Sequence, residues 1–342
     1  MKKKEPSVIQ WLAQTDAGYG VVTDGKLFRL STNNLSAGPS PFETVSEQKL
    51  IKQLNEIPVV SPKDRRKKKC SDIICKFKLS IDFSDKIDFD KNKRFCFQKE
   101  NERLFFETML GLNKKTIYRY IPFDTLYSIL DKQTFRMSGL AGMNDKSETD
   151  YFDRYRGKAS KIENDVFITS CSLLKDDLTM WRLYGDNGKG VCLVLEVRET
   201  SADSYSLLRV DYGSKSKGHE KIDLLEELIG NSFSFKELGK WKLFFKPYEF
   251  RVEKEVRLLY SSSNSSGKDI QKKWIKTSNN SIINPVVDIS LSETSFPLKL
   301  KKIILGPKFP ETDLNQRQLR EMIKDLKIGK IRVLPSKISN YR

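Results

Sequence analysis

The chain has 342 residues, enough for two domains or for one large domain with an appendage. Its hydrophobic fraction of 38% with twenty Phe can fill a core, which argues against a largely disordered chain. The net charge of +17 is typical of proteins that bind nucleic acid, although a lysine-rich proteome gives the same balance.

Cysteine and histidine usage argues against two kinds of chemistry. The five Cys are scattered and His219 is the only histidine. A zinc site is therefore not expected, nor a mechanism that needs a Ser-His or Cys-His pair. We expect no bound metal. No apolar stretch is long enough for a signal peptide or a membrane span, which predicts a cytoplasmic protein without membrane contact.

Residues 1–60 are predicted to form a small α/β appendage. Two short apolar runs, Val21–Thr23 and Lys26–Leu30, flank Asp24-Gly25, which is the signal of a β-hairpin with a two-residue turn. A capping-box pattern at Thr44-x-x-Glu47 then precedes a helical apolar stripe that ends before Pro58.

Residues 61–112 are predicted to be a basic linker with short strands. The run Lys63–Lys69 is interpreted as a solvated loop, or alternatively as a patch that contacts phosphate. Residues 73–98 alternate in short pieces such as Phe77–Ile81, which favours short strands.

A larger domain is predicted over residues 113–342. Its fold class is α+β, with a mixed, largely antiparallel sheet core and flanking helices. Asp124 is expected to cap one helix, Leu224–Ile229 to belong to a second, and the stripe around Leu319 and Ile323 to form a third. The strands are predicted at Ile117–Ile121, Phe167–Ser172, Gly190–Leu195, Lys302–Leu305 and Ile331–Leu334.

The segment Arg251–Leu258 carries the most informative charge pattern. If it is a strand, Val252, Val256 and Leu258 take one face, because successive side chains point to opposite faces. Glu253 and Glu255 then share the other face with Arg251 and Arg257. Such a row could hold a polar substrate and stabilise a cationic transition state. It could equally be the solvated face of an antiparallel strand with weak surface ion pairs.

From about residue 116 the chain resembles a bacterial family known as domain of unknown function 2971. No activity follows from that resemblance. The matching pieces are Tyr118–Tyr120, Gly142–Asp145, Phe167–Ser172, Met180–Gly185, Lys189–Cys192, Glu253–Leu258, Leu305-Gly306 and Ser339–Arg342.

The order of three motifs is also similar to that of ADP-ribosyltransferases of the Arg–Ser-x-Ser–Glu type. Arg119 matches the arginine on the first strand, Ser170-Cys171-Ser172 the Ser-x-Ser strand, and Glu253-Lys254-Glu255 the Glu-x-Glu motif. The resemblance implies an ADP-ribosyltransferase-like domain that uses NAD as a substrate. It makes Glu255 the catalytic carboxylate and Glu253 the group that orients or deprotonates the acceptor.

Binding roles follow partly from the resemblance and partly from side-chain chemistry. The Trp181/Tyr184 block has no counterpart in the transferase pattern, but its aromatic faces could stack on nicotinamide or on a target base. NAD contacts are expected from Arg119, Tyr120, Ser170, Ser172, Trp181 and Tyr184, and substrate contacts from Asn144, Asp145 and Arg257. The chemistry is consistent, because cleavage of the nicotinamide–ribose bond passes through an oxocarbenium-like cation that a carboxylate stabilises. Trp181 and Tyr184 could instead pack into a core, and Asn144-Asp145 could simply form a turn.

These patterns predict an NAD-dependent ADP-ribosyltransferase toxin that acts on nucleic acid, with RNA or single-stranded DNA preferred. A toxin–antitoxin or phage-defence setting is expected, with residues 1–110 contacting an antitoxin or chaperone partner, or positioning the target. Two alternatives remain open. One is a nuclease that uses Glu253, Glu255 and Asp145, and the other is a non-catalytic nucleic-acid-binding module.

Overall fold

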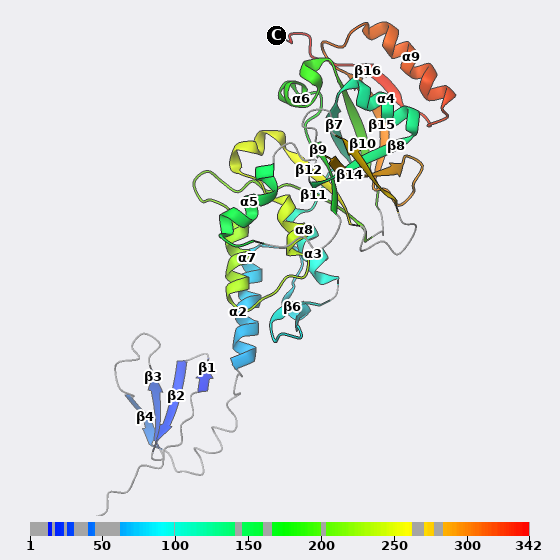
Figure 1. Cartoon of the computed structure of the whole chain (residues 1–342). Helices are drawn as coiled ribbons and strands as arrows, with labels where there is room; N and C mark the ends of the chain where they lie inside the picture. Colours follow the sequence, from blue (N-terminus) through cyan, green and yellow to red (C-terminus); the bar gives the residue numbers. More distant parts are fainter. Residues whose placement is uncertain are drawn as a thin grey trace, which may run out of the picture. The chain divides into compact units, whose positions relative to one another are not determined.

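The chain divides into two units, Met1–Asp72 and Ile73–Arg342 (Figure 1). The computed structural model describes residues 62–98, 100–140, 146–159, 166–199, 203–261, 270–276 and 283–341, together with four strands before residue 45. Within these ranges, no helix is both long enough and apolar enough to cross a membrane.

The first unit contains a four-stranded antiparallel sheet in the order β1-β2-β3-β4. Its strands are β1 (Ala13–Thr15), β2 (Gly18–Thr23), β3 (Lys26–Leu30) and β4 (Ser40–Thr44). Thr23 pairs with Lys26, so β2 and β3 form the hairpin predicted around Asp24-Gly25. The helix predicted after Thr44, with Glu47 in its capping box, lies outside the described residues.

The basic run is helical, so its interpretation as a solvated loop was wrong. It forms α2 (Pro62–Lys76). Proline suits the first position of a helix, Asp64 complements the helix dipole in the first turn, and Lys and Arg are good helix formers. Cys70, Ile73 and Ile74 are all buried, and their helical spacing gives the otherwise basic helix an apolar face.

The residues before 113 that were expected to be a linker belong largely to the second unit. They form η1 (Ser84–Lys86), the antiparallel pair β5 (Ile87–Phe89) and β6 (Phe95–Phe97), and α3 (Asn101–Leu110). Phe77–Ile81 is not a strand. The sequence reasoning missed that phenylalanines of this segment pack against the larger unit. The ring centres of Phe106 and Trp241 lie 4.7 Å apart in a stacked pair, and those of Phe97 and Phe233 lie 5.0 Å apart.

The core of the larger unit is a ten-stranded, largely antiparallel sheet with flanking helices, as the α+β prediction required. The main strand order is β13-β14-β8-β9-β7-β10-β15-β16, and β12 joins β9 to β11. The strands are β7 (Thr116–Ile121), β8 (Thr134–Gly139), β9 (Val166–Ser172), β10 (Val191–Val197), β11 (Tyr205–Arg209), β12 (Glu255–Ser261), β13 (Lys272–Lys276), β14 (Ile283–Ser290), β15 (Leu298–Leu305) and β16 (Arg332–Pro335).

Helices and 3-10 turns connect the strands of this sheet. They are α4 (Phe123–Lys132), α5 (Lys146–Arg156), α6 (Leu178–Leu183), α7 (Glu220–Gly230), α8 (Leu238–Trp241) and α9 (Thr312–Asp325), with 3-10 turns η3 (Asp186–Gly188), η4 (Lys242–Phe244) and η5 (Tyr248–Glu253). Asp124 lies in the first turn of α4 rather than at its N-cap, which is Pro122. The chain passes from β15 through α9 to β16, and the two strands pair in parallel.

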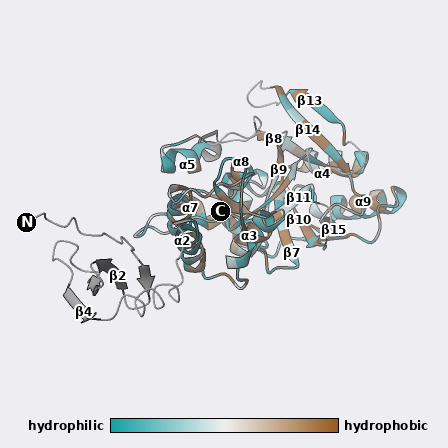
Figure 2. Ribbon diagram, turned by 90° about the horizontal axis from the view of Figure 1, so that it is seen from below, coloured by the Kyte–Doolittle hydropathy of each residue, from teal (hydrophilic) through white to brown (hydrophobic). Residues whose placement is uncertain are grey.

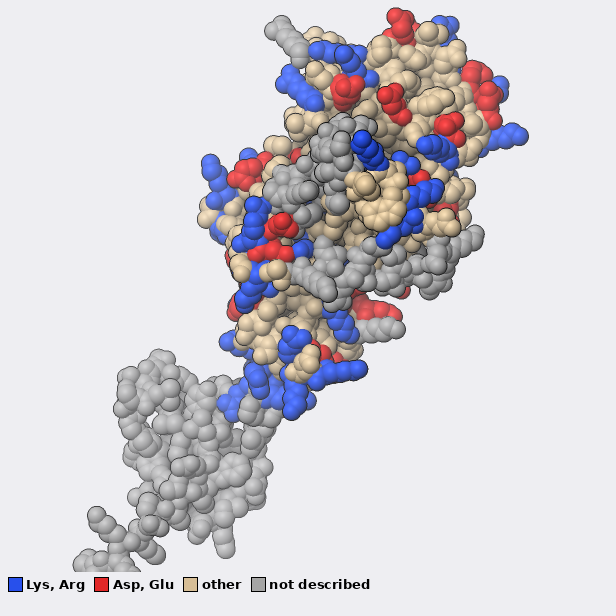
Figure 3. Space-filling view, in the orientation of Figure 1, with Lys and Arg blue, Asp and Glu red and all other residues tan. Residues whose placement is uncertain are grey.

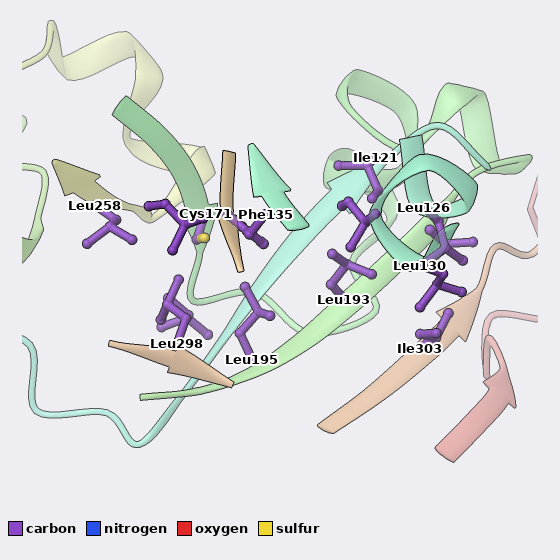
Figure 4. Close-up of a cluster of buried hydrophobic side chains, with 14 of the residues drawn as sticks. Ile121, Leu126, Leu130, Phe135, Cys171, Leu193, Leu195, Leu258, Leu298 and Ile303 are labelled. Carbon is purple, nitrogen blue, oxygen red and sulfur yellow. The ribbon is translucent and has the colours of Figure 1, made fainter. Parts of the chain in front are cut away.

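Two apolar clusters lie on opposite faces of the sheet. The larger one packs α4 and α9 against strand residues such as Leu193, Cys171 and Ile303 (Figure 4). The smaller one holds Trp181 of α6 against Tyr120. Alternate residues of β7 and β10 therefore contribute to different clusters, as a sheet covered on both faces requires.

The sheet opens beside β9. On one side β9 pairs with β12 along its whole length, from Val166–Ser261 to Ser172–Glu255. On the other side it pairs with β8 only at Phe167 and Ile168, and with β7 only at Ser172. Beyond Tyr118, β7 leaves β9 and continues along β10. This divergence leaves room for a cavity between the strands.

Candidate functional site

A cavity of about 430 Å³ lies at this opening. Strands β7, β8, β9 and β12 contribute to its wall, as do the segment after α6 and the turns before β12. The residues that line it are Tyr118, Arg119, Tyr120, Ile121, Ser138, Ile168, Thr169, Ser170, Cys171, Ser172, Met180, Tyr184, Lys246, Phe250, Glu253 and Glu255.

The two glutamates of the Glu-x-Glu motif do not share a strand, which corrects the prediction for Arg251–Leu258. Glu253 ends η5, Lys254 adopts the left-handed conformation with φ of 43°, and the strand begins at Glu255. Val252 is 50% exposed rather than buried on a strand face. The turn at Lys254, not the pleat of a strand, brings the two carboxylates together.

Lys246 joins these carboxylates. Its Nζ lies 2.7 Å from Glu253 Oε2 and 3.1 Å from Glu255 Oε2, and 4.6 Å from the centre of the Phe250 ring. All three charged side chains are nearly inaccessible to solvent. Two buried carboxylates repel each other, and the ammonium group between them offsets that repulsion.

Arg257 binds the Glu255 carboxylate without lining the cavity itself. Its Nε donates to Glu255 Oε1 at 2.7 Å and its Nη2 to Oε2 at 3.1 Å, while Nη1 donates to the carbonyl of Leu243. Arg257 is completely buried and is not among the residues that line the cavity, so the structure does not place it where the predicted substrate contact would need it. It acts on the site through Glu255.

Glu255 is a carboxylate at all ordinary pH values. Burial alone would raise its pKa, but Arg257, Lys246 and hydrogen bonds from Arg257 and Ser170 outweigh burial and lower the pKa from 4.5 to about 2. Its backbone N–H donates to Tyr212 Oη at 2.8 Å. These contacts fix a negative charge at one wall of the cavity.

The two serines of the Ser-x-Ser motif have different roles. Ser172 is buried, and its hydroxyl donates to the carbonyl of Glu253 at 2.6 Å and accepts from the N–H of Leu174 at 3.0 Å. Ser170 is exposed and donates to the Glu255 carboxylate. Ser172 therefore holds the turn, whereas Ser170 presents its hydroxyl to the cavity.

Arg119 lies on the other side of the opening. Its guanidinium donates to Thr169 Oγ1 and lies 4.8 Å from the centre of the Phe135 ring. The side chain is half-buried and lines the cavity. The split between β7 and β9 thus leaves one arginine and two glutamates in the wall of the same cavity.

The aromatic residues that were predicted to contact NAD lie partly in the core and partly at the cavity. Tyr184 lines the cavity and donates to Glu253 Oε1 at 2.6 Å. Tyr120 also lines it, with its hydroxyl donating to the Leu174 carbonyl at 3.0 Å. Trp181 is completely buried, donates to Asp176 Oδ1 at 2.8 Å and does not line the cavity, so it cannot stack on a ligand there.

Some predicted residues cannot be placed, and others were missed. Asn144 and Asp145 lie outside the described residues. The sequence reasoning did not find Lys246, which follows the buried run Trp241–Phe245, nor Phe250 and Tyr212. A lysine embedded in an apolar run is a weak signal, since Lys242 shares that setting but pairs with Asp153 at 2.5 Å.

Other chemistry at the cavity is limited by charge state and geometry. Burial raises the pKa of the Cys171 thiol to about 12, so this cavity residue is not a thiolate at neutral pH. Across the described part of the chain, no group of three or more His, Cys, Asp or Glu is placed to hold a metal ion.

The charge of Glu255 should appear in the pH dependence of stability. Because folding lowers its pKa, its contribution is complete above about pH 4.5 and is lost as the pH falls towards 2, by an amount on the order of 3 kcal/mol. The stability difference between the parent and Glu255→Gln, measured by thermal unfolding, should therefore shrink between pH 5 and pH 2.5.

Glu196→Gln provides the control for this measurement, since Glu196 is 43% exposed and pairs with Lys301 at 3.3 Å on the surface. Its stability difference from the parent should stay small across the same range. A constant difference between the parent and Glu255→Gln down to pH 2.5 would contradict the buried, charged state of Glu255.

Comparison with known proteins gives one match. The model of a family described as "Protein of unknown function (DUF2971)" matches residues 180–258. This segment contains Tyr184, Lys246, Glu253 and Glu255, and the match supports the domain family that the sequence motifs indicated. Comparisons with curated proteins and with solved structures found no match. None of these comparisons bears on the likeness to ADP-ribosyltransferases.

Proposed function

We propose that the cavity binds NAD and that the chain transfers ADP-ribose from NAD to nucleic acid. The observation that supports this most is that Arg119, Ser170, Ser172, Glu253 and Glu255 all line one cavity. They come from three separate stretches of the chain, and only the split in the sheet brings them together.

The charges of the site suit a pyrophosphate. Arg119, Lys246 and Arg257 supply three positive charges, against two negative charges from Glu253 and Glu255. Arg119 lines the cavity apart from the ion pairs of Glu253 and Glu255, and a guanidinium forms paired hydrogen bonds with phosphate oxygens. Arg119 therefore anchors the pyrophosphate of NAD.

Glu255 is the group that faces the reacting ribose. The bond between C1′ of the ribose and N1 of nicotinamide breaks, its electron pair leaves with nicotinamide, and positive charge develops on the ribose. A carboxylate with a pKa of about 2 is fully charged when that cation forms. Of the donors to Glu255, the exposed Ser170 hydroxyl is the one that a ribose hydroxyl can replace at least cost.

Glu253 completes the transfer. The acceptor attacks C1′, and its proton passes to Glu253, whose carboxylate is oriented by Tyr184 and Lys246.

The positive charge of the larger unit supports nucleic acid as the acceptor, with Lys and Arg spread over the face seen in Figure 3. Such an activity suits a toxin in a toxin–antitoxin or phage-defence system, with residues 1–110 engaging an antitoxin.

Calorimetric titration with NAD tests the binding step. We expect the parent chain to bind NAD, and Arg119→Met to weaken binding at least about tenfold through loss of charge-assisted hydrogen bonds. Arg332→Met is the matched control, because Arg332 is exposed on β16 and does not line the cavity. Absence of NAD binding to the parent, or equal binding by Arg119→Met and the control, would refute the proposal.

A further inference from the structure

Strand β13 presents an unusual surface at the margin of the larger unit (Figure 2). Its sequence is Lys-Lys-Trp-Ile-Lys, and within the described residues it pairs only with β14. Trp274 is 62% exposed, and all three lysines are exposed. Lys272 Nζ lies 5.4 Å from the centre of the Trp274 ring.

Protection of the sheet edge can explain the lysines of β13 but not its exposed tryptophan. Lysines on an edge strand discourage pairing with another chain, and Lys272, Lys273 and Lys276 could have that role alone. A largely exposed tryptophan works against it, because it offers a broad apolar face to a partner. The aromatic ring among three cations therefore points to a ligand that has both flat rings and negative charge.

The register connects β13 to the cavity. Lys273 pairs with Val286 of β14, and Val286 pairs with Ser138 of β8, which lines the cavity. Neighbouring strands lie about 4.8 Å apart, so the backbone of Lys273 is about 10 Å from that of Ser138. A ligand bound along β13 thus lies near β8, the strand that contributes Ser138 to the cavity wall.

The strip between them is also basic. Arg136 of β8 donates to Asp288 Oδ1 at 2.7 Å, and Lys273 donates to Asp288 Oδ2 at 3.4 Å. Arg136, Lys273 and Asp288 share the sheet face of Ser138, whereas Lys272, Trp274 and Lys276 lie on the other face of β13, because successive side chains of a strand point to opposite faces. The edge strand therefore carries lysines on both of its faces, and Asp288 offsets one of the positive charges.

We propose that β13 is a docking surface for single-stranded nucleic acid, with Trp274 stacking on a base and Lys272 and Lys276 contacting phosphates. Bases in a single strand have free faces for stacking, whereas those in a duplex are already stacked on each other. The inference deepens the proposed function by naming the acceptor as single-stranded, and it rests on that function only for the transfer step.

Fluorescence anisotropy with labelled 12-nucleotide RNA, single-stranded DNA and duplex DNA tests this surface. The parent should bind the single strands more tightly than the duplex. Trp274→Ala should weaken single-strand binding about 5- to 100-fold, which corresponds to the loss of one base stack. The double variant Lys272→Gln/Lys276→Gln should reduce the slope of log K against log salt by about 1.4.

Tyr127→Ala is the control, because Tyr127 is 54% exposed on α4 and lies outside both the cavity and β13. It should bind like the parent. Equal affinities of Trp274→Ala and Tyr127→Ala for single strands, no binding by the parent, or equal binding of duplex and single strands would overturn the proposal.

NAD titration of the same variants separates this inference from the proposed function. Trp274→Ala should bind NAD like the parent. Trp274-dependent binding of single strands by a chain that does not bind NAD would refute the transferase and uphold the docking surface. NAD binding with oligonucleotide binding that is indifferent to Trp274 would refute the docking surface alone.

Discussion

Replacing Glu255 with Gln is expected to abolish the release of nicotinamide from NAD in the presence of nucleic acid. The substitution keeps the size of the side chain but removes the negative charge that faces the ribose cation. Loss of a charge placed for the transition state commonly lowers the rate by at least about a hundredfold. Chromatography of the nicotinamide released by equal amounts of the two proteins measures the effect.

The experiment must separate lost chemistry from lost folding, because Glu255 is also a partner of two buried cations. Thermal unfolding will show whether Glu255→Gln remains folded at the assay temperature, and NAD titration will show whether it still binds through Arg119. Glu196→Gln should release nicotinamide at the parental rate. A folded Glu255→Gln that binds NAD and keeps the parental rate would remove Glu255 from the mechanism.

Arg257→Met should give the largest loss of stability among the site residues. Arg257 is completely buried, and its side chain donates twice to Glu255 and once to the Leu243 carbonyl. Breaking a buried pair by removal of one partner typically costs about 3–5 kcal/mol. In Arg257→Met, Glu255 would keep only one cation, Lys246, which it shares with Glu253. Urea unfolding of the variant should show a loss of this size.

A double-mutant cycle identifies the origin of that loss. If the loss comes from the buried Glu255 carboxylate without Arg257, Glu255→Gln introduced into Arg257→Met should recover part of the stability. Arg332→Met, on the exposed part of β16, should change stability by no more than about 0.5 kcal/mol. An Arg257→Met variant as stable as this control would contradict the pairing described here.

Several strands of the larger unit, such as β7, β9 and β10, were predictable because their apolar residues leave few alternatives, whereas β8, β11, β13 and β14 were not predicted. Gly190–Leu195 is nearly all apolar, and the corresponding strand β10 is buried almost throughout. The predicted alternation of side chains between the two strand faces is confirmed at Glu255–Leu258. Val256 and Leu258 lie in the core, and Arg257 lies on the opposite face with Glu255. Where burial on a sheet sets the pattern, sequence period and structure agree.

The local geometry of the site was less predictable. The left-handed turn at Lys254 interrupts the predicted strand, and a lysine gives no warning of that conformation, which glycine or asparagine normally adopts. Trp181 and Tyr184 have similar residue types and one helical turn of separation, yet only Tyr184 reaches the cavity. Lys246 could not be assigned, because its partners approach it through the tertiary fold.

Incubation of the parent chain with NAD labelled in its adenylate phosphate tests the central claim most directly. The acceptors are RNA, single-stranded DNA, duplex DNA and a protein extract, offered separately. We predict that label becomes covalently attached to single-stranded nucleic acid and to no other acceptor. NAD that stays intact with every acceptor would contradict the assignment of the cavity as a transferase site.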